Sequence, residues 1–307
     1  MKNKRTLGQY FTRYNPFSLN PFLIWAKSID IKNKIILEPF AGENNLIRFL
    51  IDHNLCSGYV SFDIEPKAID VHYRDTLKDF PVNFDICVTN PPWLAKNSAT
   101  KMKVPFYAGT YDDLYKYALS KCLLHCKYVV AIIPESFIRA GLFLKRLNTF
   151  VSLTSNAFED TTHPVGLALF DNTIIEDVKI YRDNQFIGFL SEIEKKRPPY
   201  TTTKEITFNE QNGNLGLIAL DNCKEASIRF CEPQELQGYT VKKHGRHITI
   251  LNIPFKPRIK EYNDVINDFR SSTQDVLMTS YRGIRKDGFY RRRLDWQLAK
   301  DIICYIA

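Results

Sequence analysis

The sequence predicts an α/β protein whose core is a doubly wound, mostly parallel sheet of seven strands. Strand-like apolar runs alternate with helical stretches up to residue 170, a glycine turn follows the first run, and one buried strand stops at two prolines. The last two strands are expected to form a hairpin at the sheet edge. The expected strands of this sheet are 34–40, 59–62, 71–73, 84–90, 128–134, 151–158 and 165–170, and the expected helices are 16–29, 46–53, 66–70, 111–126 and 141–150. Later in the chain a hairpin is expected at 178–190 around residues 182–185, and short strands are expected at 215–220 and 247–253.

The strand at 84–90 leads directly into Asn90, Pro91, Pro92 and Trp93. Its apolar residues suit a central parallel strand that is covered on both faces, and two prolines can neither donate to a ladder nor continue it. Open α/β sheets bind ligands at the carboxyl ends of their strands. The motif is therefore expected to present an amide side chain, a carbonyl and an aromatic ring at a binding site.

This set of groups suits methylation of an exocyclic amine on a planar base. The Asn90 side-chain oxygen and the Pro91 carbonyl can each accept one N–H, which draws the nitrogen toward tetrahedral geometry and turns its lone pair toward a sulfonium methyl. Such a reaction requires no general base. Stacking of the base on Trp93 is worth roughly 1–3 kcal/mol. The alternative is that the four residues form only a strand-ending turn.

A nucleotide site is expected where residues 41–45 join the first strand to the helix at 46–53, since backbone N–H groups at a helix N-terminus face such ligands. Asn44 stands where a second glycine is usual, and asparagine adopts the left-handed conformation more readily than most residues. Asp63, at the tip of the second strand, is the expected ribose ligand, with Glu65 as the second choice. The alternative role for Asp63 is to cap the helix expected at 66–70. Asp75 is placed to accept from an adenine amino group.

The connection at 96–110 is polar, and it is long for a compact domain. Connections of this length are usually lids or binding loops. Cys122 and Cys126 lie one helical turn apart with His125 between them. Because no second pair of ligands accompanies them, buried core thiols are expected rather than a metal site.

The charge distribution divides the chain into a catalytic domain at 1–177 and a basic target-recognition region at 178–307. Lys and Arg number 20 against 18 Asp and Glu in the first part and 22 against 16 in the second, within a net charge of +8. The tail interleaves basic and aromatic residues, a nucleic-acid footprint, although arginines on a solvated face are the alternative. The expected DNA-binding residues are Arg282, Arg285, Lys286, Arg291, Arg292 and Arg293.

The location and assembly expected from the sequence are those of a cytoplasmic monomer. No apolar run is long enough to span a bilayer, and Met1–Arg5 leads into polar residues rather than a secretory signal. Seven cysteines without a framework spacing agree with a reducing compartment.

Four motifs, in their order along the chain, resemble the S-adenosylmethionine-dependent DNA adenine-N6 methyltransferases of the gamma class. They are Gly8-Gln9-Tyr10-Phe11-Thr12, Leu37-Glu38-Pro39-Phe40-Ala41-Gly42, Asp63-Ile64-Glu65-Pro66 and Asn90-Pro91-Pro92-Trp93. The resemblance covers the first 170 residues and implies a Rossmann-like methyltransferase fold followed by a recognition region, which is short here for this class. The implied partners are double-stranded DNA and a cognate restriction endonuclease.

The resemblance also implies a role for each matching residue. Asn90 and Pro91 would accept from the target amine, with Pro92 and Trp93 completing the catalytic motif, and Trp93 and Phe158 would stack on opposite faces of a flipped adenine. S-adenosylmethionine would be bound by Tyr10, Phe11, Thr12, Glu38, Pro39, Gly42, Asp63, Ile64, Asp75 and Asn90.

Two other classes of function fit parts of this pattern. Asn-Pro-Pro with an aromatic residue is similar to motifs of RNA-adenine and protein glutamine-N5 methyltransferases, because an amide nitrogen poses the same chemical problem. A catalytically silent nucleic-acid-binding module could keep the same fold. The Tyr-Phe-Thr element and the basic C-terminal region favour DNA.

Overall fold

The chain divides into two compact units, Met1–Phe186 and Ile187–Ala307. The computed structural model describes residues 12, 14–155, 158, 162–239, 241–242 and 244–307. The boundary between the units falls inside strand β9 (Gln185–Phe189). The assignment of target recognition to the second part of the chain stays a prediction.

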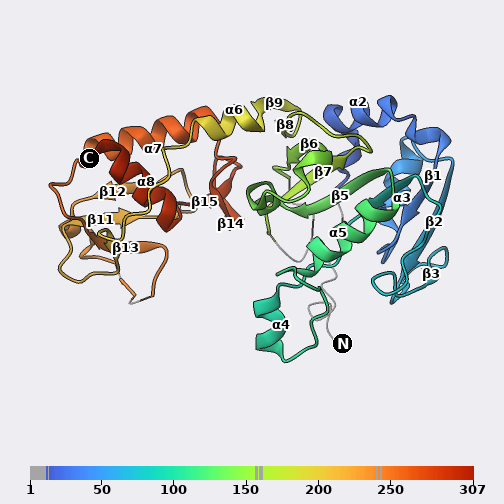
Figure 1. Cartoon of the computed structure of the whole chain (residues 1–307), viewed down its shortest axis with the longest axis horizontal. Helices are drawn as coiled ribbons and strands as arrows, with labels where there is room; N and C mark the ends of the chain where they lie inside the picture. The colour runs from blue at the N-terminus through green and yellow to red at the C-terminus, as the bar shows by residue number, and fades with distance from the viewer. Residues whose placement is uncertain (1–11, 13, 156–157, 159–161, 240, 243) are drawn as a thin grey trace. The chain divides into compact units, whose positions relative to one another are not determined.

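A nine-stranded sheet forms the core of the first unit, with the order β3-β2-β1-β4-β5-β7-β6-β8-β9 (Figure 1). Adjacent strands from β3 to β5 are all parallel, whereas β7 is antiparallel to both β5 and β6. The order 3-2-1-4-5 is that of a doubly wound sheet, so the α/β class and the mainly parallel sheet are confirmed. The strands are β1 (Ile35–Glu38), β2 (Gly58–Asp63), β3 (His72–Tyr73), β4 (Ile86–Thr89), β5 (Tyr128–Pro134), β6 (Leu147–Ser152), β7 (Val165–Phe170), β8 (Lys179–Arg182) and β9.

The predicted count of seven strands is wrong because β8 and β9 extend the same sheet. β8 pairs in parallel with β6 over four residues, from Thr149↔Lys179 to Ser152↔Arg182. Ile180 is thereby fully buried. The chain reverses at Asp183 and Asn184, and Asp183 takes the left-handed conformation (φ 47°). The edge of β6 therefore gains a partner from a stretch that the sequence analysis had assigned to the C-terminal region.

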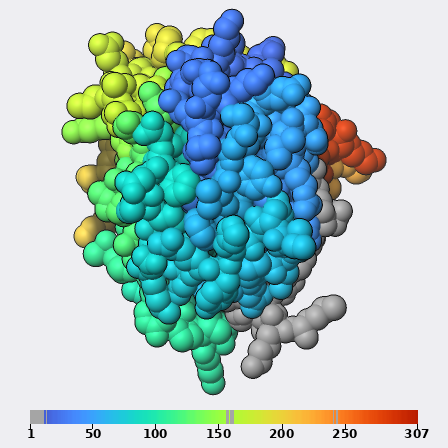
Figure 2. Space-filling view, turned by 90° about the vertical axis from the view of Figure 1, so that its right-hand side faces the viewer, coloured from blue at the N-terminus to red at the C-terminus, as the bar shows by residue number. Residues whose placement is uncertain are grey.

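Helices and short 3₁₀ turns connect these strands. The face shown in Figure 2 is formed by the blue and cyan first part of the chain, beside the β3 edge. In Figure 1, α5 crosses in front of β5, and α4 projects from the sheet with the segment that follows it. The elements are η1 (Pro16–Ser18), α2 (Asn20–Ser28), η2 (Ile31–Asn33), α3 (Asn45–Asp52), α4 (Lys96–Met102), α5 (Leu114–His125), η3 (Glu135–Ala140) and η4 (Leu144–Arg146).

Four local predictions are wrong. The helix expected at 141–150 is replaced by η4 and the start of β6, because Gly141 (φ 65°) and Phe143 (φ 58°) are left-handed and interrupt a helical backbone. Residues 66–70 form bends and a turn instead of a helix. The connection at 96–110 contains α4, and the strand expected at 151–158 runs from Leu147 to Ser152.

The interior of the first unit lies around β4 and β5. Ile86, Cys87 and Val88 of β4 are completely buried. Burial and the neighbouring thiols of Cys122 and Cys126 raise the pKa of Cys87 well above its ordinary value. Within the described residues, no group of three His, Cys, Asp or Glu side chains is placed to hold a metal ion, and no helix is both long and apolar enough to cross a bilayer.

The second unit contains a four-stranded antiparallel sheet of order β10-β13-β11-β12 and a separate two-stranded ribbon, β14-β15. The strands predicted at 215–220 and 247–253 are confirmed as β11 and β13. The elements are α6 (Leu190–Lys195), β10 (Thr207–Phe208), β11 (Leu215–Ile218), β12 (Arg229–Cys231), η5 (Pro233–Leu236), β13 (Ile248–Asn252), α7 (Ile259–Thr273), β14 (Thr279–Ile284), β15 (Tyr290–Arg293) and α8 (Trp296–Ile306).

The packing of β7 against β6 makes a testable prediction about Gly166. A Cβ atom at this position would clash with the ring of Phe150, which is 1% exposed. We expect Gly166→Ala to destabilise the protein by about 1–3 kcal/mol, the usual cost of overpacking a core, in urea-induced unfolding. Phe150→Leu removes part of the obstacle, so the double variant should lose less stability than the two single losses combined. Strictly additive losses would show that the two positions are not in contact.

Candidate active site

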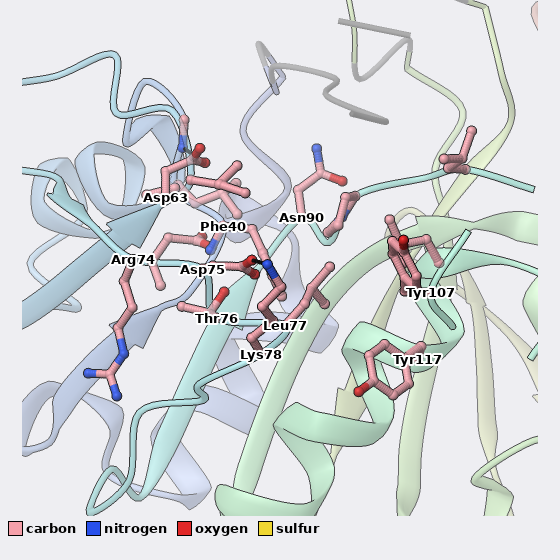
Figure 3. A pocket seen from close by; sticks show the side chains of 18 of the residues that line it. Phe40, Asp63, Arg74, Asp75, Thr76, Leu77, Lys78, Asn90, Tyr107 and Tyr117 are labelled. Carbon is pink, nitrogen blue, oxygen red and sulfur yellow. Dashed lines mark hydrogen bonds and ion pairs between the residues drawn. The ribbon is translucent and has the colours of Figure 1, made fainter. Parts of the chain in front are cut away.

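A cavity of about 500 Å³ lies in the first unit at the carboxyl ends of β1, β2 and β4. In Figure 3, Asp63 and Asp75 lie on one side of Asn90, and Tyr107 and Tyr117 lie on the other. Eight of the residues predicted to bind cofactor or target line this cavity. They are Thr12, Glu38, Gly42, Asp63, Ile64, Asp75, Asn90 and Pro92.

The turn after β1 is built on two left-handed residues, Gly42 (φ 51°) and Asn44 (φ 62°). Asn44 therefore adopts the left-handed conformation that was expected of it. Its side chain is fully buried, donating from Nδ2 to Asp70 (2.7 Å) and accepting at Oδ1 from Ser61 (2.8 Å). Asparagine thus supplies both the backbone conformation and two hydrogen bonds that tie the turn to β2 and the segment after it.

Asp63 closes this turn from the end of β2. Its Oδ2 accepts from the Gly42 N–H (2.8 Å) and its Oδ1 from the Glu65 N–H (2.7 Å). A carboxylate offers about four acceptor positions, so both oxygens retain the capacity to accept from a ligand hydroxyl. Glu65, the second choice for this role, does not line the cavity and pairs with Lys67 at the surface (3.3 Å). The alternative role of helix cap does not apply to Asp63, since no helix follows it.

Glu38 ends β1 at the base of the cavity and is 1% exposed. Burial raises its pKa to about 8, and the nearby charge of Asp63 adds to this rise. Hydrogen bonds from Thr89 Oγ1 (2.7 Å) and the Phe40 N–H (3.1 Å) lower the pKa but do not offset burial. At pH 7 the side chain is therefore a neutral acid, which can become an anion when a cationic ligand reaches it. Pro39 does not line the cavity, and its carbonyl accepts from Thr76 (2.8 Å).

Asn90 follows β4 directly and reaches the cavity from the centre of the sheet. Its Nδ2 donates to Thr12 Oγ1 (3.3 Å), and the Thr12 carbonyl accepts from Asn45 of α3 (3.1 Å). Thr12, predicted to lie beside the cofactor, therefore connects the target motif to the helix after the glycine turn. Tyr10 and Phe11 lie outside the described residues.

The rings of Trp93 and Phe158, which are predicted to stack on opposite faces of a base, contact each other in this structure. Trp93 is 9% exposed and does not line the cavity. Its ring meets that of Phe158 edge to face, with centroids 5.2 Å apart, and also contacts His163. Trp93 lies outside the lining because of the alternation of an extended chain, in which Asn90, Pro92 and Leu94 line the cavity while Pro91 and Trp93 do not.

Several aromatic lining residues on the side facing α5 were not predicted from the sequence. Phe106 and Tyr107 follow α4, and Tyr117 belongs to α5. Tyr107 is 78% exposed. An aromatic pair within the polar stretch at 96–110 was the available signal, since aromatic side chains are enriched in binding surfaces. Other lining residues that were missed include Arg74, Thr76, Leu77 and Lys78.

Two of the six residues predicted to bind DNA are internal to the second unit. Arg285 and Arg270 donate to the fully buried carboxylate of Asp221, each at 2.8 Å. Burial by itself would raise the pKa of Asp221, but the hydrogen bond and charge of Arg270 hold it below the usual range. Arg292 is also buried and donates to Ser280 (2.8 Å).

The guanidinium groups of Arg270 and Arg285 face the interior because a buried carboxylate requires partners. The remaining four residues reach solvent to different extents. Arg282 and Lys286 are exposed, and Arg291 and Arg293 are partly buried.

Comparison with known proteins gives a partial likeness of fold. No family model and no curated protein matches the sequence. Similar solved structures include the modification subunit of a candidate type I restriction enzyme from Vibrio vulnificus, with 13% identity, a TM-score of 0.40 and coverage of 57% of this chain and 47% of that one. A type I restriction-modification methyltransferase subunit from Streptococcus thermophilus has 19% identity, a TM-score of 0.38 and coverage of 61% and 52%.

A candidate RNA methyltransferase from Pyrococcus horikoshii has 16% identity, a TM-score of 0.40 and coverage of 57% and 93%. The chain spans about half the length of the first two proteins.

The buried acid Glu38 makes the stability of the protein depend on pH. Its pKa is raised from 4.5 to about 8 on folding, so the folded state holds the proton more tightly, and this contribution is complete below pH 4.5 and is lost as the pH rises through 8. In Glu38→Gln, which stays neutral, the free energy of unfolding should fall less between pH 6 and pH 8, by about 2 kcal/mol. Parallel pH profiles in urea unfolding would show that Glu38 is ionised in the folded protein.

Proposed function

We propose that the chain transfers a methyl group from S-adenosylmethionine to the N6 amine of adenine in double-stranded DNA. The observation that carries this proposal is that one cavity brings together Asn90, the Gly42 turn and the buried acids Glu38 and Asp63. A reaction between a base and a bound nucleoside needs two sites side by side. The Asn90 amide can bind the base, and the turn at the adjacent strand end can bind the nucleoside.

The described residues fit this cofactor in charge, polarity and size. Asp63 offers acceptors for the ribose hydroxyls, and Asp75 lines the same side of the cavity. Ile64, Leu77 and Phe106 supply apolar surface for a purine ring. A volume of about 500 Å³ lies in the range of small-molecule sites.

Glu38 supplies the feature that is specific to this cofactor. When bound, S-adenosylmethionine supplies a methyl group on a positively charged sulfur and also carries an ammonium group. An acid held neutral by burial can release its proton as this positive charge arrives, and the resulting carboxylate stabilises the bound cation. The Thr89 hydroxyl, which donates to Glu38, belongs to the residue that directly precedes Asn90. The cofactor end and the target end of the site are thus linked through adjacent residues of one strand.

The Asn90 side-chain oxygen accepts one N–H of the target amine, and the backbone carbonyl of Pro91, a residue next to the cavity lining rather than part of it, accepts the other. Because Asn90 Nδ2 donates to Thr12, the nitrogen of the amide faces Thr12 and its oxygen points in another direction. Thr12 is therefore a positioning residue for Asn90. Because duplex DNA hides the amine in its stack, the adenine has to rotate out, at a cost of a few kcal/mol.

Stacking on Trp93 and Phe158 remains part of the proposal in an altered form. The two rings contact each other in this structure, so a base can lie between them only after they separate. Tyr107 and Tyr117 line the cavity itself and are further candidates for contact with the base.

Nucleic acid is proposed over protein glutamine because of the second unit, and the resemblance of the Tyr-Phe-Thr element at residues 10–12 favours DNA over RNA. Arg282 and Lys286 are exposed in the second unit, next to the partly buried Arg291 and Arg293. Cations on a surface of this kind suit phosphates and have no purpose toward a glutamine side chain. The family resemblance of the motifs extends the proposal to a cognate restriction endonuclease as a partner.

Substitutions at the two ends of the cavity should separate transfer from cofactor binding. Asn90→Ala is expected to lower the rate of methyl transfer to DNA by a factor of about 10²–10³, as loss of one positioned polar group does at a reacting centre, with little change in cofactor affinity. Asp63→Asn should instead weaken cofactor binding by a factor of about 10, because one acceptor becomes a donor.

The measurements are calorimetry with S-adenosylmethionine and transfer of a labelled methyl group to DNA, RNA and protein. Equal turnover by Asn90→Ala and the unmodified protein would exclude the amine-activation role. Transfer to RNA or protein in preference to DNA would replace the proposed substrate, and cofactor binding without transfer to any of the three would indicate a silent module.

A further inference from the structure

In the second unit, backbone hydrogen bonds hold His247 and Arg293 beside one short segment, Ala219–Leu220. The Ala219 N–H donates to the His247 carbonyl (2.7 Å), and the Ala219 carbonyl accepts from the Leu294 N–H (2.8 Å). Leu220 forms an antiparallel bridge with Arg293. The start of β13 and the end of β15 are thus fixed next to each other, although they are distant in the sequence.

Tyr281 of β14 brings a second arginine to the same place. The His247 ring meets the Tyr281 ring edge to face at 5.1 Å, and the Arg291 guanidinium lies 5.3 Å from the centroid of the same ring. Arg291 Nε also donates to the Asp221 carbonyl (2.7 Å), which restricts this side chain. His247, Arg291, Arg293 and the nearby Lys242 are called the phosphate cluster below.

The charges in the phosphate cluster are all of one sign. Partial burial lowers the pKa of His247 below 6.5, and the positive charges of Arg293, Arg291 and Lys242 lower it further. The imidazole is therefore neutral at pH 7 and lies among three cations. An anion that enters this cluster would be attracted by those cations and would also restore the proton to His247.

A polar groove next to the phosphate cluster indicates what kind of anion it binds. Lys242 and one carboxylate, Glu210, line this groove together with four amide side chains, those of Asn209, Gln211, Asn212 and Asn252. The Asn209 Oδ1 atom is shielded from solvent and has no hydrogen-bond partner among the described residues. Asparagine and glutamine amides are the side chains that read the edge of adenine, whereas a free phosphate or a small metabolite does not need a row of them.

We propose that the phosphate cluster binds a backbone phosphate of duplex DNA, with the amide-lined groove placed toward the neighbouring base edges. This inference rests on the proposed function for its choice of DNA over RNA. It assigns phosphate contact to His247 and Lys242, which were not among the DNA-binding residues predicted from the sequence. Arg285 and Arg292 serve instead as internal supports of the ribbon.

Binding of a phosphate at this cluster should be accompanied by uptake of a proton. In the free protein His247 loses its proton below pH 6.5, and a bound phosphate raises its pKa, so the affinity for DNA should rise as the pH falls from 8 to 6. One linked proton allows a change of up to about tenfold per pH unit in the range between the two pKa values.

The test is fluorescence anisotropy of the full chain with a labelled DNA duplex, without cofactor, at constant salt from pH 6 to pH 8. We expect the affinity of the unmodified protein to rise several-fold, about 3-fold or more, toward pH 6, and His247→Gln to show about half of that change or less. His244→Gln is the matched control, because it removes another exposed histidine of the same segment and should keep the full pH dependence. Arg291→Ala should also reduce the salt slope of binding by about 1, whereas Lys260→Ala on α7 should not.

Three outcomes would overturn the inference: an unchanged pH dependence in His247→Gln, an equal loss in His244→Gln, or tighter and equally pH-dependent binding of a matched RNA duplex. Thermal unfolding of each variant shows whether its fold is kept. The proposed function is tested separately by methyl transfer. A protein that binds DNA with the expected pH dependence and transfers no methyl group would contradict the proposed function while supporting the phosphate cluster.

Discussion

The candidate site depends on one backbone constraint, which is that β4 cannot continue past Asn90. Pro91 and Pro92 provide no N–H groups to a ladder, so the chain leaves the centre of the sheet at the point where β1 and β2 also end. The Asn90 amide therefore shares a cavity with the Gly42 turn and Asp63. Glu38 and Thr89, which are hydrogen-bonded to each other, form the base of this arrangement and hold neighbouring strand ends together.

Two buried carboxyl groups show how burial and charge pairing lead to opposite states. Glu38 has hydrogen-bond donors but, within the described part of the chain, no cation against it, so burial prevails and the neutral acid is favoured at pH 7. Asp221 is equally buried, yet the guanidinium groups of Arg270 and Arg285 keep it ionised. The first acid can respond to a cationic ligand, whereas the second is neutralised within the fold and serves to hold α7 against the β14-β15 ribbon.

Much of the fold and the site could be predicted from the sequence because it follows from local rules. Apolar runs and their stops placed β1, β2, β4 and β5, and parallel strands then brought Glu38, Asp63 and Asn90 to one edge. The motif did not reveal that Trp93 lies outside the cavity lining, because neighbouring residues of an extended chain face opposite sides. Its stacking on a base stays a prediction. Phe106 and Tyr107 reach the cavity only through the path of the chain after α4.

The second unit was harder to predict for a physical reason. Arginines that bind phosphates and arginines that neutralise a buried acid look alike in a sequence, and only the position of Asp221 separates Arg285 from Arg282. The hairpin at 178–190 was expected, but its place in the main sheet could not be assigned, because the pairing of β8 with β6 depends on an edge that the sequence does not reveal.

The most direct measurement of the central claim is methylation-sensitive sequencing of DNA from cells that express the protein, compared with cells that express Asn90→Ala. The account predicts N6-methyladenine at a defined sequence motif in the first culture and none at that motif in the second. Adenine methylation that is identical in both cultures, or absent from both while the protein is folded and binds S-adenosylmethionine, would contradict it.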